Sequence, residues 1–418
     1  MKNDVSRIRI NGPRLLEDLE KVKEKTETPG KGVTRFSYSA MDREARAYLI
    51  ESGESFGLSI ETDSVGNMFF RFPEDQGKPV ILAGSHIDTV QNGGWLDGIY
   101  GTLSVLEAMR RIREEALVCS KSIQLVIFAE EEGSNFGSTL TGSKFLTGRY
   151  GKNDLDSLKN QDGISLGEIL IKEGYPPYNE DMMLDWRRIQ GMLELHIEQG
   201  PVLAQQGIGI GIVERIYGMK VVEFTFVGVG NHAGASPMMG RQDALAAAAA
   251  GILEVESCGI NLGQGQAVAT VGKIQVLPNG SNVISQQVTF TVEVRSAQEE
   301  TIHAIMEEIQ YRMEEICNRR NIRCHYRQVA FSKPDSMNPK MVALLEETAN
   351  RLGEPYLRMN SGAVHDACML APFVPTGMIF VPSLGGRSHV PQEDTRPEDL
   401  IRGADFLLAA LLQLADCK

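Results

Sequence analysis

The stretch "PVILAGSHIDTVQNGGWLDG", residues 79–98, decides the fold class of this chain. It begins with an apolar run that shows little alternation, and a second run of the same kind, "LVIFA", follows at residues 125–129. Apolar runs without alternation are typical of strands that are covered on both faces, as in parallel sheets. The sequence therefore predicts an α/β domain in which helices flank a mostly parallel sheet.

The segments around these two runs agree with that prediction. Residues 15–25 and 42–57 have the pattern of amphipathic helices, and residues 58–72 have the pattern of strands. Near the C-terminus, a helical pattern at 338–353 is followed by a buried strand and then by a long closing helix that ends near residue 415. The first and last parts of the chain therefore belong to one domain.

The middle of the chain has a different pattern. Between residues 216 and 329 the strand and helix patterns follow one another in the order βαββαβ, which is that of the ferredoxin-like α+β unit. We therefore expect a second, smaller domain at 216–329, inserted into a first domain made of residues 1–215 and 330–418. Two connections would carry the insert and could serve as a hinge, so the insert could act as a lid.

Composition excludes several classes of partner. A formal net charge of −13 argues against nucleic acid, because binding to phosphates needs a local excess of Lys and Arg. The charged N-terminal segment and the lack of any run of about 18 apolar residues argue against a membrane. The six cysteines form no CxxC pair, which fits reduced thiols. We expect a soluble, cytoplasmic protein.

The opening stretch also carries polar side chains that follow its apolar run. His86 comes directly after the predicted strand, and Asp88 and Asp97 lie two and eleven residues further on. In an extended segment His86 and Asp88 would point to the same face, so that Asp88 could orient the His86 ring. On their own, these residues are more typical of a polar turn or of a buried polar pair than of a functional site.

Three further segments repeat this arrangement. Glu130 to Glu132 follow the second apolar run, and three adjacent carboxylates would repel one another if they were buried without a cation. A solvated acidic turn is the alternative. His196 in "ELHIEQGP" and His389 in "GGRSHVPQED" each follow another apolar run. Because ligands bind at the carboxyl ends of strands in open α/β sheets, we expect these segments to meet.

A mixed set of His, Asp and Glu indicates a particular group of metals. Such a set suits Zn²⁺, Mn²⁺ or Co²⁺ better than Ca²⁺ or Mg²⁺, which prefer oxygen ligands alone. With five ligands and one shared aspartate, two ions about 3.5–4 Å apart would fit.

Eight motifs in the chain together resemble one family of enzymes. They are "GSHIDTVQNGGWLDG", "AEEEGSNFG", "LHIEQGPVL", "GNHAGASPM", "PNGSNVI", "VEVRS", "SGAVHDA" and "IFVPSLGGRSH". The chain is similar to the N-carbamoyl-L-amino-acid hydrolases and allantoate amidohydrolases from about residue 32 to its C-terminus. That family belongs to the two-metal peptidases and amidases, which include aminoacylases and carboxypeptidases.

The resemblance implies a centre of two divalent ions per subunit, with Zn²⁺ expected first and Mn²⁺, Co²⁺ and Ni²⁺ as alternatives. The implied ligands are His86, Asp97, Glu132, His196 and His389. His86 and His196 would bind one ion, and Asp97 would bridge it to the other. Glu131 would be the catalytic general base that takes the proton of the attacking water. The choice between Glu131 and Glu132 comes from the resemblance and not from spacing.

The resemblance also implies contacts with the substrate and between subunits. The matching substrate-binding residues are Gln199, His232, Asn282, Arg295, Gly362 and Ala363. The catalytic His232 would help to hold the developing oxyanion, reaching a neighbouring subunit because the insert forms a homodimer in that family. Arg295 could clamp a substrate carboxylate. Val364 stands where a glycine is common in the family, which bears on the shape of the pocket.

These implications lead to one hypothesis of function and three rivals. The leading hypothesis is hydrolysis of the ureido group of N-carbamoyl-L-amino acids, which releases the amino acid, CO₂ and ammonia. Allantoate is the nearest rival substrate, because it would use the same catalytic residues. A dipeptidase or aminoacylase on the same metal site is a second rival, and a non-enzymatic binding protein is the third.

Overall fold

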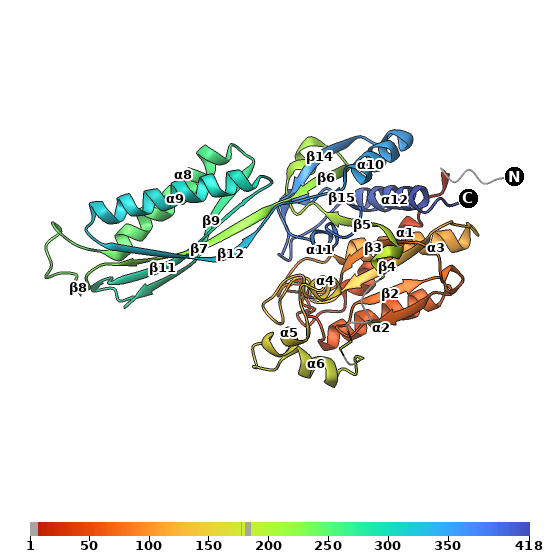
Figure 1. Cartoon of the computed structure of the whole chain (residues 1–418), viewed down its shortest axis with the longest axis horizontal. Helices are drawn as coiled ribbons and strands as arrows, with labels where there is room; N and C mark the ends of the chain where they lie inside the picture. The colour runs from red at the N-terminus through yellow and green to blue at the C-terminus, as the bar shows by residue number, and fades with distance from the viewer. Residues whose placement is uncertain (1–6, 177, 180–184) are drawn as a thin grey trace. The chain divides into compact units, whose positions relative to one another are not determined.

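The computed structural model describes residues 7–176, 178–179 and 185–418. The chain forms two compact units (Figure 1), of which the first contains Met1–Glu214 and Ser336–Lys418 and the second contains Arg215–Asp335. The insert had been expected to end at residue 329, but that position lies inside strand β12 (Arg323–Ser332). The strand continues to Ser332 because it stays paired with Met219 of β7.

The first unit is built on a nine-stranded sheet. Its order is β1-β2-β4-β3-β5-β15-β6-β13, and β14 pairs with β6 outside this path. The strands are β1 (Ser59–Thr62), β2 (Met68–Arg71), β3 (Val80–His86), β4 (Ser122–Phe128), β5 (Ile189–Ile197), β6 (Ile210–Ile216), β13 (Asp335–Ser336), β14 (Tyr356–Ser361) and β15 (Thr376–Val381). The four central strands β4, β3, β5 and β15 pair in parallel. Strand β2 pairs antiparallel with β1 and β4, and β6 pairs antiparallel with β15.

Burial explains why apolar and polar residues do not alternate along the central strands. Every residue of β3 and of β15 is buried, so both faces of the sheet centre are covered. The helices of this unit are α1 (Gly12–Lys23), α2 (Ala40–Glu54), α3 (Ile99–Glu114), α4 (Thr141–Leu146), α5 (Lys152–Ser157), α6 (Leu166–Lys172), α7 (Val202–Gln206), α10 (Pro339–Leu352), α11 (Ala367–Leu370) and α12 (Pro397–Leu414). Helix α3 packs against β3, β4 and β5, and α12 packs against β15 and α3. The predicted α/β fold is confirmed.

The second unit is a four-stranded antiparallel sheet with two long helices. Its strand order is β12-β7-β11-β9, formed by β12, β7 (Gly218–Val227), β11 (Gln287–Ser296) and β9 (Ala267–Leu277). Helices α8 (Ala244–Gly263) and α9 (Glu299–Arg319) lie side by side on one face (Figure 1). The alternate residues of β11 are buried, and they join α8 and α9 in one apolar core. This is the ferredoxin-like arrangement that the sequence predicts.

Helix α8 is long and apolar enough, by length and composition alone, to cross a membrane, and it is the only such helix among the described residues. Ala244, Ala247, Ala248 and Val255 on one side of it are buried in the core of the second unit. Core helices of soluble proteins share this length and composition.

The expectation that all six cysteines are reduced is wrong for one pair. Cys119 and Cys417 form a disulfide across 298 residues of sequence, whereas Cys258, Cys317, Cys324 and Cys368 form no disulfide with any described residue. The bond forms because the last residues of the chain pair with the segment that leads into β4. Spacing along the sequence carries no signal for such a contact.

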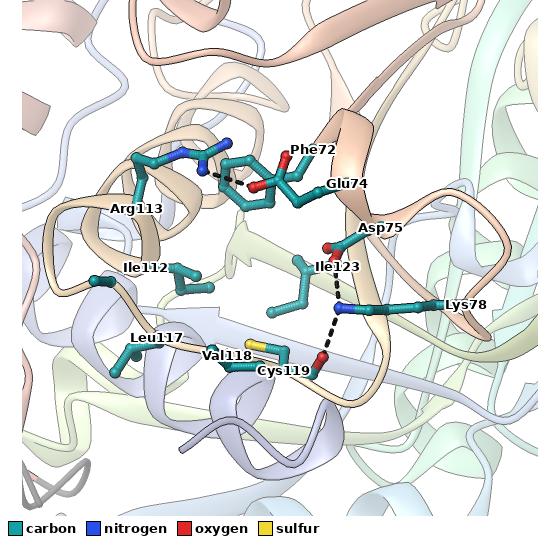
Figure 2. A pocket seen from close by; sticks show the side chains of 11 residues that line it. Phe72, Glu74, Asp75, Lys78, Ile112, Arg113, Leu117, Val118, Cys119 and Ile123 are labelled. Carbon is teal, nitrogen blue, oxygen red and sulfur yellow. Dashed lines mark hydrogen bonds and ion pairs between the residues drawn. The ribbon is translucent and has the colours of Figure 1, made fainter.

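Cys119 of this disulfide also lines a pocket of about 320 Å³, whose lining side chains are drawn in Figure 2. Its lining includes Cys119 and residues at the amino ends of β3 and β4. The Lys78 ammonium lies 2.5 Å from Asp75 Oδ1, and Arg113 Nη1 lies 2.6 Å from Glu74 Oε1. The charges of the pocket therefore neutralise one another, and none of the predicted site residues lines it.

Candidate metal centre

The predicted ligands meet at the carboxyl edge of the parallel strands. His86 is the last residue of β3, His196 lies one residue before the end of β5, and Glu132 follows β4. His389 lies in the loop between β15 and α12. Strands β4, β3, β5 and β15 are neighbours in the sheet (Figure 1), and their parallel direction brings these ends to one edge.

Two histidines and one aspartate form the first ligand set, that is, a group of side chains that could hold a metal ion together. The ligand atoms of His86, Asp97 and His196 all lie within 4.8 Å of one another. Asp97 Oδ1 is 3.0 Å from His196 Nε2 and 3.5 Å from His86 Nε2. All three side chains are buried, so water does not screen their charges.

The same aspartate takes part in a second set. Asp97, Glu132 and His389 also offer ligand atoms within 4.8 Å of one another. His389 Nε2 is 3.3 Å from Asp97 Oδ2 and 3.4 Å from Glu132 Oε2. The two oxygens of Asp97 therefore face different sets, and this geometry suits a residue shared by two ions.

The residues present fit a pair of divalent ions. Each set combines imidazole and carboxylate ligands, which suit Zn²⁺ and related transition metals. Glu132 Oε1 is buried and has no hydrogen-bond partner among the described residues. A buried carboxylate oxygen without a donor costs free energy unless a cation neutralises it.

Backbone carbonyls orient the two buried histidines. His86 Nδ1 lies 3.0 Å from the Asp88 carbonyl oxygen, and His196 Nδ1 lies 2.9 Å from the Ile197 carbonyl oxygen. When Nδ1 donates its proton to these carbonyls, Nε2 keeps a lone pair for a cation.

The structure corrects the way in which Asp88 was expected to act. Its carboxylate lies 3.7 Å from His86 Nδ1, beyond hydrogen-bond distance. It instead accepts hydrogen bonds from the backbone N–H groups of Glu131, at 3.2 Å, and Glu132, at 3.0 Å. Because the chain turns after His86, the carbonyl faces the ring while the carboxylate holds the glutamate segment.

The three consecutive glutamates have different surroundings. Glu130 Oε1 accepts hydrogen bonds from the backbone of Asn135 and Phe136, at 2.8 and 2.7 Å, and so closes the following turn. Glu131 Oε2 lies 3.7 Å from His86 Nε2, and Glu132 faces His389. Spacing alone could not separate Glu131 from Glu132, whereas the structure places Glu132 in a ligand set and Glu131 beside one.

The charged groups of the cluster shift one another's pKa values strongly. Burial lowers the pKa of His86, but the carboxylates of Glu131, Asp97 and Asp88 outweigh it and raise that pKa well above its usual value. The hydrogen bond to Asp97 raises the pKa of His389 to about 9. Burial raises the pKa of Glu132 to about 8. Without a cation, the cluster therefore holds protons on its ligands at neutral pH.

Metal binding should for this reason release protons and strengthen as the pH rises toward 9. His86, His196 and His389 all have raised pKa values, and an imidazole must lose its second proton before it can bind a cation. The affinity for Zn²⁺ should rise by up to about tenfold per pH unit for each displaced proton. Calorimetric titration of chelator-treated protein with Zn²⁺, in buffers of different protonation enthalpy, measures the protons released. An affinity that does not change with pH would contradict this prediction.

Other predicted residues of the first unit also lie around the cluster. Gln199 donates a hydrogen bond from Nε2 to Asp97 Oδ2 at 2.7 Å. Gly362 and Ala363 follow β14, where Ser361 Oγ lies 2.9 Å from His365 Nε2. The His365 ring packs edge-on against the ring of His196, with ring centroids 4.6 Å apart. No sequence pattern indicates this position of His365, because a contact between two rings leaves no mark in the sequence.

The remaining three predicted residues belong to the second unit. His232 lies in β8 (Asn231–His232), and its pairing with Val283 of β10 (Val283–Ile284) brings Asn282 next to it. Arg295 pairs with Met219 near the other end of β11. Within this unit the structure brings His232 and Asn282 together but not Arg295.

The fold and the cluster define the class of the protein as a metal-dependent hydrolase. Residues 82–413 match the profile of Peptidase family M20/M25/M40. The chain belongs to this family, and it is an enzyme that hydrolyses C–N amide bonds.

Proteins of similar sequence and structure indicate the branch of this family that the chain resembles. The chain is 36% identical, over 97% of its length and 99% of the relative's, to an N-carbamoyl-L-amino acid amidohydrolase of Geobacillus stearothermophilus. It is 34% identical, over 93% of its length and 94% of the relative's, to an allantoate amidohydrolase of Escherichia coli strain K12. A crystal structure of a hydantoinase/carbamoylase family amidase from Burkholderia multivorans matches with a TM-score of 0.89 and 34% identity, covering 98% of both chains. The predicted resemblance is confirmed.

Proposed function

We propose that the protein hydrolyses the ureido group of N-carbamoyl-L-amino acids, releasing the amino acid, CO₂ and ammonia. The observation that carries this proposal is the shared Asp97, whose two oxygens face two separate ligand sets at the carboxyl edge of the sheet. Relatives that are named N-carbamoyl-L-amino-acid amidohydrolases, at 33 to 36% identity, support this substrate class.

The proposed centre holds two divalent ions, with Zn²⁺ expected first and Mn²⁺, Co²⁺ and Ni²⁺ as alternatives. When bound, the ions supply Lewis acidity and lower the pKa of a water molecule toward neutrality. His86 and His196 hold one ion, Glu132 and His389 hold the other, and Asp97 holds both. Metal analysis of the purified protein should find two equivalents per chain.

In this proposal Glu131 transfers a proton from the attacking water to the leaving nitrogen. It takes a proton from the attacking water and passes it to the ureido nitrogen whose bond to the carbonyl carbon breaks, so that ammonia departs as a neutral molecule. The N-carboxy amino acid that remains then loses CO₂ and gives the amino acid. Glu131 is 6% exposed, and burial raises the pKa of its carboxyl group well above the usual value. A carboxylate with a raised pKa is a stronger base and can hold the proton between the two steps.

The choice of substrate is tested by steady-state kinetics. Metal-loaded enzyme is assayed with a series of N-carbamoyl-L-amino acids and with allantoate, and both the amino acid and the ammonia are measured. Glu131→Gln, purified in the same way, controls for contaminating hydrolases. Tenfold higher kcat/KM for allantoate would replace the proposed substrate by allantoate, the second candidate, which is supported by relatives of that name at 34 and 35% identity. Amino acids released from dipeptides without any ammonia from ureido compounds would favour a peptidase instead.

We further propose a homodimer that forms through the second unit. Strand β9 is at the edge of its sheet, and the exposed apolar side chains Val268, Ile274 and Leu277 lie on it. Helix α8, which packs beside β9, exposes Leu253 and Ile260 to 66 and 68%. A long edge strand beside exposed apolar residues is typical of a pairing surface.

A charge on this edge should separate the subunits. Val268→Glu places a carboxylate in the proposed interface, and light scattering should then report a monomer. Val329→Glu is the matched control, since Val329 is 49% exposed on the opposite edge strand β12 while Val268 is 53% exposed. A wild-type monomer, or equal dissociation of both variants, would count against the proposed interface.

The positions of the substrate-binding candidates support a site that two subunits complete. Arg295 is eight residues along β11 from Gln287, which lies at the His232 end, so the strand separates them by roughly 27 Å. One copy of the second unit therefore does not present Arg295 and His232 at the same point. Two copies could supply them to one site, with Arg295 from one subunit and His232 with Asn282 from its partner.

His232→Ala should lower kcat about 10²-fold without changing metal content, because it removes one stabiliser of the oxyanion and no metal ligand. His232 is exposed, and its Nδ1 accepts hydrogen bonds from the backbone of Gly234 and Ala235, both at 3.1 Å, which leaves Nε2 directed away from its own loop. His325→Ala, an exposed histidine on β12, is the control. Equal kinetics for both variants would exclude His232 from the site.

A further inference from the structure

Glu393 is a buried carboxylate that contacts two of the ligand loops. It lies four residues after His389 and is 1% exposed. Its Oε1 accepts hydrogen bonds from the backbone N–H groups of Leu96, at 2.9 Å, and Asp97, at 3.1 Å. Its Oε2 lies 2.7 Å from the Ser388 hydroxyl and accepts a hydrogen bond from the His389 N–H at 3.3 Å. One side chain thus joins segments that are 296 residues apart.

The backbone at Gly94 is shaped around this carboxylate. A Cβ at position 94 would lie 1.9 Å from the carboxyl carbon of Glu393 and 2.0 Å from its Oε1. Gly94 has no positive φ, so its conformation is one that other residues adopt. The need for glycine therefore comes from the close approach of Glu393.

The two proposed ligands that Glu393 contacts lie outside the strands of the sheet. Asp97 and His389 lie in loops, whereas His86 and His196 lie on strands β3 and β5. The His389 side chain is 49% exposed, and its backbone is left-handed with φ 59°. A ligand in a loop keeps its position only if other contacts hold its backbone.

We propose that Glu393 is a positioning residue that sets Asp97 and His389 at the right separation to bind an ion together with Glu132. This inference rests on the proposed two-ion function. Glu393 contacts two of the three ligands in the set of Asp97, Glu132 and His389. In the set of His86, Asp97 and His196 it contacts Asp97 alone, so its loss should weaken one ion selectively.

Glu393→Gln tests this selectivity. If the glutamine oxygen accepts from the Leu96 and Asp97 N–H groups, its NH₂ group faces the His389 N–H and cannot accept from it, so the two loops should move apart. Metal-free protein is titrated with Zn²⁺ against a chelator, which resolves two affinities in the wild type. In Glu393→Gln one Zn²⁺ should bind about 10- to 100-fold more weakly, while the other keeps its affinity.

The matched control is Glu107→Gln on helix α3. Glu107 is also 1% exposed, and it accepts a hydrogen bond from the Asn11 N–H at 2.9 Å and pairs with Arg14 at 2.7 Å. This variant loses a buried carboxylate of the same kind outside the ligand loops, and both Zn²⁺ should bind as in the wild type. If Glu107→Gln loses the same ion, the effect is general destabilisation and the inference is wrong.

Gly94→Ala is a second, independent variant that keeps the charge. Its Cβ should displace the Glu393 carboxylate and lower the affinity for the same Zn²⁺. If Glu393→Gln does not fold, this variant tests the positioning role of Glu393 in its place. Wild-type affinities in both variants would overturn the inference and leave the two-ion proposal standing. A wild-type protein that binds fewer than two Zn²⁺ would overturn the proposed function itself.

Discussion

Glu131→Gln is expected to lower kcat by about 10²- to 10⁴-fold while the protein keeps its metal ions. The amide has nearly the same size as the carboxylate but cannot accept a proton at neutral pH. Glu131 lies beside the ligand sets, with its Oε2 3.7 Å from His86 Nε2, and belongs to neither set. The substitution should therefore lower kcat and leave the metal content and KM unchanged.

Glu132→Gln is the matched comparison, because the two glutamates are adjacent in sequence and differ in role. Glu132 belongs to the set with Asp97 and His389, so its substitution should lower metal content as well as rate. The two variants are compared by metal analysis after dialysis and by kinetics at saturating substrate. If Glu131→Gln loses metal and Glu132→Gln keeps it, the two roles are reversed. Wild-type activity in Glu131→Gln would remove it as the base.

Asp97→Asn should have the larger effect on metal binding, because it alters both ligand sets at once. Burial raises the pKa of Asp97, but His196, His389 and His86 outweigh burial and hold that pKa well below its usual value. The side chain is therefore a carboxylate at neutral pH. Asparagine retains one neutral oxygen and directs an NH₂ group at one of the two sets.

We expect Asp97→Asn to bind both ions at least about 10²-fold more weakly, since loss of an outer partner alone costs about 10- to 100-fold. Activity should not return when excess Zn²⁺ or Mn²⁺ is added. Asp75→Asn is the control, because Asp75 is a buried aspartate of the same unit that pairs with Lys78 at the amino edge of the sheet. An Asp97→Asn protein that retains two tightly bound ions would show that Asp97 is not shared.

The central strands and the ligand candidates could be predicted because both depend on local signals. An uninterrupted apolar run such as residues 80–84 indicates a strand that is covered on both faces, and β3 is buried at every residue. A histidine or carboxylate directly after such a run lies at the carboxyl edge of the sheet whenever the strands are parallel. The alternation along β11 likewise marked the sheet of the second unit.

Other features could not be predicted, because they depend on contacts between distant segments. The Cys119–Cys417 disulfide joins residues 298 positions apart. The orienting contact to His86 comes from the Asp88 carbonyl, which every residue possesses and no sequence pattern can mark. Glu393 stood in the quoted motif around His389, yet only the folded chain shows that it reaches the Asp97 loop.

The sequence by itself determined the two units, the strand ends and the types of side chain placed there, since periodicity and apolar runs are local properties of the chain. Only the tertiary structure decided which groups each of those side chains contacts. It turned Glu130 away to close its own turn, placed Glu132 opposite His389, and directed the two oxygens of Asp97 to different sets. The physical reason is that ligand geometry depends on distances of 3 to 4 Å between residues from four strand ends, and packing alone sets those distances.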